Sequence, residues 1–223
     1  MSTTALISST PWQTRTDDRR LVTAGIVAGP LFVASGVVQA LTREGFDLRR
    51  HALSQLSTGD LGWVQMLTFV ATGLCLTVLG VAVLRSRGLV RGRRTIAVGV
   101  MVLGIGLAVA GLFPTDPANG FPAGTPDTAG AMTWHGVVHG TAAVVAFLGL
   151  AVATGAATVH AIRARAVRPA VLSGLTTIVL LLPSPPQFAS MQLAVTGLVS
   201  LTWTTALALR LYRGTTAHGG DVR

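Results

Sequence analysis

The chain has 223 residues, of which 50% are hydrophobic and only 11% are charged. Because soluble domains carry about 25% charged residues, this composition excludes an ordinary soluble fold and favours a protein that spans a membrane. The net charge of +9 comes from arginines gathered between apolar runs. That distribution is typical of membrane topology rather than of a nucleic-acid surface, so we expect membrane lipids, and no nucleic acid, as partners.

Six apolar runs predict an all-α membrane bundle of six transmembrane helices. In chain order the predicted spans are 21–42, 62–84, 95–113, 135–159, 167–185 and 188–209, within one domain over 21–212. A disordered cytoplasmic tail is expected over 1–20, and a second cytoplasmic tail over 213–223. Two pairs of glycines four residues apart, Gly25 with Gly29 and Gly136 with Gly140, are spaced to let neighbouring helices approach closely.

The fifth predicted span is the shortest. Its uncharged core, 170–182, corresponds to a helix of about 20 Å, against roughly 30 Å of hydrocarbon, so a re-entrant hairpin is the alternative. Charge favours a spanning helix, because an N-terminus inside the cell places 14 of the 17 arginines in cytoplasmic segments. We therefore predict six spans with both termini in the cytoplasm. The use of arginine alone as the basic residue suggests a bacterial source, and hence the inner (plasma) membrane.

This topology collects most of the chemically competent side chains at the outer face of the membrane. They are His51, Ser54, Asp60, Asp116, Asp127, His135 and His139. The stretch 47–59 predicts a short amphipathic helix lying at that interface, with Asp47 as its N-cap and Gly59 as its stop. Its leucines would face one way, and its polar residues, including His51 and Thr58, the other.

Two histidines in the fourth span suggest a metal site. His135 and His139 are four residues apart and share one face of a helix, and Asp116 supplies a carboxylate near the same rim. Two imidazoles, one carboxylate and a water form a set that Zn²⁺ accepts. His51, Ser54 and Asp116 are the candidate catalytic residues, placed to orient the water or a substrate. The alternative is that the histidines are structural and bond Asp116 and loop carbonyls.

Three stretches resemble the bacterial and archaeal membrane proteins of domain-of-unknown-function family 998. They are Ser54-Gln-Leu-Ser-Thr-Gly with Gly62-Trp63, Gly111-Leu-Phe-Pro-Thr-Asp-Pro, and Gly130 with the His135/His139 region. The resemblance implies a six-helix membrane domain with Ser54, Asp116 and one histidine in its polar core, and it implies no known activity. One departure concerns a Gln-Arg pair near the start of the last helix in such proteins, because here Gln192 is followed by Leu193.

Two functions follow from these observations. The first is binding of a lipid or a partner in a polar pocket at the outer face. The alternative is a metal- or acid/base-dependent membrane hydrolase acting on lipid-like substrates; a distant similarity to alkaline ceramidase-like hydrolases matches in residue types but not in spacing. A transporter is not favoured, because no charged residue lies deep in a predicted helix.

Overall fold

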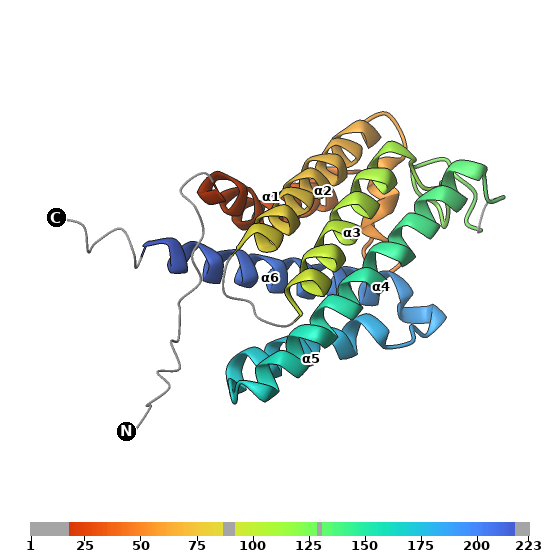
Figure 1. Cartoon of the computed structure of the whole chain (residues 1–223). Helices are drawn as coiled ribbons and strands as arrows, with labels where there is room; N and C mark the ends of the chain where they lie inside the picture. Colours follow the sequence, from red (N-terminus) through yellow and green to blue (C-terminus); the bar gives the residue numbers. More distant parts are fainter. Residues whose placement is uncertain (1–17, 87–91, 129–130, 217–223) are drawn as a thin grey trace, which may run out of the picture.

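The computed structural model describes residues 18–86, 92–128 and 131–216, and the part of the chain that it describes is helical (Figure 1). Its helices are α1 Asp18–Thr42, α2 Gly62–Arg85, α3 Arg93–Leu112, α4 Trp134–Arg163, α5 Val167–Leu181 and α6 Ala189–Thr216. Two short 3₁₀ helices, η1 Leu53–Ser57 and η2 Pro186–Phe188, lie in the connections. The all-α prediction is confirmed, whereas most of the predicted N-terminal tail, part of the C-terminal tail, Gly130 and two arginines of the 85–94 loop lie outside the described residues.

Five of the described helices, α1, α2, α3, α4 and α6, are long and apolar enough to cross a membrane. The fifth in chain order, α5, is shorter. It has 15 residues and ends at Leu181 rather than at the predicted residue 185. The helix stops there because Pro183 disfavours helical backbone at the residue before it, Leu182, whose ψ is 124°. At 1.5 Å per residue α5 measures about 22 Å, which is less than the hydrocarbon thickness of roughly 30 Å.

The helices pack mainly against their chain neighbours, with α6 returning to lie against α1 (Figure 1). Close contacts between α2 and α3 depend on glycine, since a Cβ on Gly104 would lie 2.5 Å from the backbone nitrogen of Thr77. Gly25 and Gly29 also meet neighbouring helices, as their spacing predicted: Gly25 meets Leu79 on α2, and Gly29 meets α6. The pair in α4 is different. Gly136 lies against the Asp116 carboxylate, and Gly140 faces open space.

The amphipathic helix predicted over 47–59 is wrong. Only the five residues of η1 are helical, because Ala52 before them is extended, with ψ of 149°. His51 and Thr58, expected on an exposed polar face, are buried. His51 and Gln55 instead bond to backbone carbonyls of the loop between α3 and α4, so tertiary contacts hold the segment.

Candidate functional site

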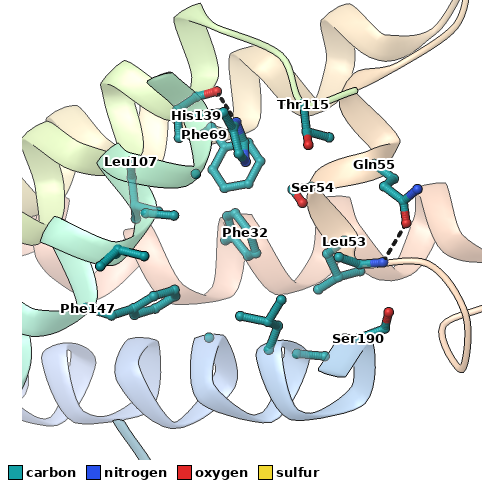
Figure 2. Close-up of a pocket in the computed structure, with 18 of the residues that line it drawn as sticks. Phe32, Leu53, Ser54, Gln55, Phe69, Leu107, Thr115, His139, Phe147 and Ser190 are labelled. Carbon is teal, nitrogen blue, oxygen red and sulfur yellow. Dashed lines mark hydrogen bonds between the residues drawn. The ribbon is translucent and has the colours of Figure 1, made fainter. Parts of the chain in front are cut away.

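A cavity of about 530 Å³ lies between α1, α2, α3, α4 and α6, at the end of the bundle that η1 and the α3–α4 loop cover. Figure 2 shows that its two halves differ in chemistry. The polar rim, at the covered end, is formed by Ser54, Thr115, Asp116, Asn119 and Ser190. The apolar wall, deeper in the bundle, is formed by Phe32, Phe69, Leu103, Leu107, Phe147 and Leu201. The cavity is therefore amphipathic along the direction of the helices.

His139 lies where the polar and apolar halves meet, and its side chain is 6% exposed. Its Nδ1 is 2.9 Å from two carbonyl oxygens, those of Ala110 and Phe113, at the end of α3. Carbonyls in the last turn of a helix have no partner within the helix, so the imidazole supplies a missing donor. Because carbonyl oxygens only accept, Nδ1 carries the proton, and in the neutral imidazole Nε2 is left as an acceptor.

The remaining surroundings of His139 hold the ring in place. It packs edge-to-face with the ring of Phe69, with ring centroids 5.8 Å apart and planes at 83°. Figure 2 shows the ring edge away from the α3 carbonyls pointing into the cavity. Nε2 has no hydrogen-bond partner among the described residues, so it offers a ligand in the cavity an unused acceptor.

Ser54 contributes another polar group without a protein partner to the cavity. It belongs to η1, and its side chain is half-buried and lines the cavity (Figure 2). Its backbone carbonyl accepts a hydrogen bond from the hydroxyl of Ser57 at 2.7 Å, but its own hydroxyl bonds to none of the described residues. The Ser54 hydroxyl is thus free to donate to, or accept from, a molecule in the cavity.

Asp116 also lines the cavity, but its carboxylate is engaged with the start of α4. It accepts from the backbone nitrogen of Thr133 at 3.0 Å and from the Thr133 hydroxyl at 2.5 Å. Thr133 is the N-cap of α4, and its hydroxyl accepts from Gly136 N. A carboxylate is favourable here because the N-terminus of a helix carries partial positive charge. Asp116 therefore joins the α3–α4 loop to α4 and brings a negative charge to the rim.

His51 and His135 lie away from the cavity lining. His51 is 2% exposed. Its Nδ1 accepts from the backbone nitrogen of Asp47, and its Nε2 donates to the carbonyl of Asn119, both at 2.9 Å. The His135 ring stacks on that of Trp134, with centroids 3.7 Å apart. Of the residues predicted to form the site, the cavity thus gathers Ser54, Asp116 and His139.

The predicted zinc set is not assembled. Among the residues that the structure describes, no group of three or more His, Cys, Asp or Glu side chains is placed to hold a metal ion. The physical reason lies in the partners of the predicted ligands: Asp116 is turned to Thr133, and His139 is turned by its Nδ1 to the carbonyls of α3. The structural alternative holds in part, because His139 bonds to carbonyls rather than to Asp116.

Two residues that the sequence reasoning missed hold the cover of the cavity together. Gln55 accepts from the backbone nitrogen of Ala52 at 2.9 Å and donates to the carbonyl of Ala118 at 3.0 Å. Arg43 donates to the carbonyls of Leu56 and Thr58. Burial lowers the pKa of Arg43, and the charge of nearby Asp60 acts in the opposite direction. The one signal in the sequence for such a role was Gln55 itself, an amide between leucines in one of the stretches that resemble family 998.

A separate buried polar group lies between α1 and α2 and does not line the cavity. Gln39 donates from Nε2 to Gln65 Oε1 at 2.7 Å and to Ser35 Oγ at 3.0 Å. Ser35 Oγ is in turn 2.7 Å from the hydroxyl of Thr68. Two buried atoms of this group, Gln39 Oε1 and Gln65 Nε2, have no partner. The group is thus incompletely satisfied in an apolar setting.

Comparison with known proteins gives one result. The family model described as "Protein of unknown function (DUF998)" matches residues 26–210, which is most of the chain and includes α2 to α5, most of α1 and α6, and every residue that lines the cavity. No curated protein and no solved structure matches. The chain belongs to the DUF998 family, as its sequence motifs indicated, and this family has no assigned function.

Proposed function

We propose that this protein binds an amphiphilic membrane lipid in the cavity, with the lipid head group at the polar rim and its hydrocarbon chain along the apolar wall. The observation that carries the proposal is the division of one cavity into a polar and an apolar half (Figure 2). Its volume of about 530 Å³ lies within the range of roughly 300–1,000 Å³ that small-molecule sites occupy. An amphiphile matches both halves at once, whereas a uniformly polar solute matches only the rim.

A gap between α4 and α6 favours a lipid over a soluble ligand. These two helices do not pack closely on one another. Gly140 on α4 and Gly197 on α6 both line the cavity, and a Cβ built on either would meet no atom within 4 Å. Exposed apolar side chains, Val144 and Leu193, flank the gap. In a membrane this gap would open onto hydrocarbon, so a lipid chain could enter from the bilayer.

We further propose that the polar rim lies at the outer surface of a bacterial plasma membrane. The opposite end of the bundle carries arginines at the start of α1 and α3 and at the end of α4, among them Arg20, Arg94 and Arg163. Cytoplasmic segments of membrane proteins are enriched in such residues. The lipid bound in the cavity would then come from the outer leaflet.

The proposal is tested by filling the cavity. Ala143→Phe and Ala194→Phe place a ring where these half-buried alanines line the cavity. Ala34→Phe makes the same change on the exposed side of α1 and serves as the matched control. Native mass spectrometry of the full chain released from lipid nanodiscs should show lipid bound to the wild type and to the control, and at least tenfold less on the two cavity variants. Equal lipid occupancy in all four proteins would refute the proposal.

A lipid hydrolase is the second candidate. The observation that favours it is that a serine hydroxyl, Ser54, and an imidazole acceptor, His139, are both unengaged in the same cavity. In that mechanism His139 Nε2 would take the proton of the Ser54 hydroxyl or of a water as that oxygen attacks a lipid ester. Liquid chromatography of lipids incubated with the protein would reveal turnover, which Ser54→Ala and His139→Asn should each abolish. Absence of any lipid product from the wild type would rule it out.

A further inference from the structure

We infer that the cavity selects a lipid with a neutral, hydroxyl-bearing head group, and that His139 Nε2 accepts the hydrogen bond of that hydroxyl. This inference rests on the proposed lipid-binding function and adds the class of head group and the residue that recognises it. The carrying observation is an acceptor without a protein partner, on a buried residue at the junction of the polar rim and the apolar wall, where the head group of a bound amphiphile would lie (Figure 2).

The direction of the hydrogen bond follows from the other side of the imidazole ring. Nδ1 faces two carbonyl oxygens and must donate to them, which leaves Nε2 with a lone pair. Nε2 has no protein partner at the cavity, so a ligand that brings a donor gains a hydrogen bond there. An ester or an ether presents only acceptors to Nε2, so it leaves the imidazole unpaired.

The charges around the cavity favour a neutral donor over an anionic head group. Asp116 brings a carboxylate to the rim and would repel a phosphate or a carboxylate. The nearest cation lining the cavity, Arg50, already forms an ion pair with Asp127. The Ser54 hydroxyl, in the same cavity, can accept or donate. An alcohol satisfies these groups without bringing a charge into a half-apolar cavity.

Two isomeric probes test the inference. 1-Tridecanol and dodecyl methyl ether contain the same atoms and similar chains, and only the alcohol donates a hydrogen bond. Tritiated forms of both are bound to the full chain in one detergent at pH 8. We expect the ratio of alcohol to ether affinity to be roughly tenfold higher for the wild type than for His139→Phe, which keeps a ring against Phe69 and removes the acceptor. His135→Phe, the same change at a histidine that does not line the cavity, is the matched control and should leave this preference in place.

Each outcome bears on the inference. Saturable binding of both probes with the same affinity ratio in the wild type and in His139→Phe overturns the head-group assignment and leaves lipid binding intact. Failure of the wild type to bind either probe overturns the inference together with the proposed function. If His139→Phe does not fold, ¹⁵N-histidine spectra of the wild type decide. Tridecanol, but not the ether, should shift an unprotonated imidazole nitrogen, and equal shifts or none would refute the inference.

Discussion

The paired glutamines between α1 and α2 lead to a prediction whose sign differs between the two partners. Gln65→Leu removes one hydrogen bond, from Gln39 Nε2, and also removes the unpartnered Gln65 Nε2. Gln39 keeps its bond to Ser35 in this variant. An interhelical hydrogen bond in a membrane bundle contributes on average about 0.6 kcal/mol, whereas a buried unpaired polar group costs about 1–3 kcal/mol. Gln65→Leu should therefore be neutral or should stabilise the fold by up to about 2 kcal/mol.

Gln39→Leu should have the opposite effect. It removes the bonds to Gln65 and to Ser35, and it leaves both polar atoms of Gln65 unpaired at a position that is 0% exposed. The newly unpaired Gln65 Oε1 is offset by the removal of the unpartnered Gln39 Oε1, so the three lost hydrogen bonds leave a destabilisation of about 1–2 kcal/mol. In the double variant the unpaired amide is absent as well, so its stability should exceed that of Gln39→Leu alone by at least about 1 kcal/mol.

Unfolding of the four proteins by increasing SDS in mixed micelles, followed by far-UV circular dichroism, measures these free energies. Thr23→Val, at an exposed position of α1, is a control for a polar-to-apolar change outside the buried group. The reasoning is refuted if Gln65→Leu destabilises the protein as much as Gln39→Leu. It is also refuted if the effects of the two substitutions simply add.

Three other predictions use the same unfolding titration. Gly104→Leu collides with the backbone of Thr77 and should lower the free energy of unfolding by at least about 1–3 kcal/mol. Gly140→Leu enters open space and should change this free energy by less than about 0.5 kcal/mol. Equal losses in the two variants would contradict the assignment of the α4–α6 gap. Gln55→Ala should destabilise the cover of the cavity by about 1–2 kcal/mol and speed amide hydrogen exchange in the residues before η1. Unchanged exchange would show that Gln55 does not hold this cover in place. Asp127→Ala should change stability by less than about 1 kcal/mol, because its ion pair is largely exposed, and a larger loss would indicate a further role.

The membrane helices could be read from the sequence because they depend on the solvent around them. A run of uncharged residues is long enough to span hydrocarbon whatever its neighbours are, so five of the six spans appear as long helices. The end of α5 depends on a local rule, the effect of Pro183 on the residue before it. That rule can be applied to the sequence alone, but the thickness of the hydrocarbon favoured a longer helix for the fifth span.

The structure of the segment that includes η1 could not be predicted in the same way. Its residues suit an amphipathic helix, yet His51 bonds to Asn119 and Gln55 to Ala118, each more than 60 positions away along the chain. Such contacts replace local helical bonds and leave no periodic signal. The composition therefore indicated a polar segment here, but not which part of the protein its side chains would bond to.

The sequence predicted the location of the site better than its chemistry. Ser54, Asp116 and His139 do line one cavity, but the spacing of two histidines did not reveal what each ring faces. The partners of His139 are backbone carbonyls at the end of α3, which no side-chain motif records. The side chains that divide the cavity into two halves, such as Phe32 and Phe147, resemble any other apolar residue in a membrane helix.

The two nitrogens of the His139 ring have different roles, which constrains substitution at this position. One nitrogen completes the end of α3, and the other points into the cavity, so any substitution alters the helix end and the cavity together. A homologue that adapts to a different ligand by changing this residue must find another donor for the α3 carbonyls. Compensating changes are therefore expected at the end of the third helix, at positions that contact no ligand. In this family, divergence in specificity and repair of stability should occur as paired substitutions across α3 and α4.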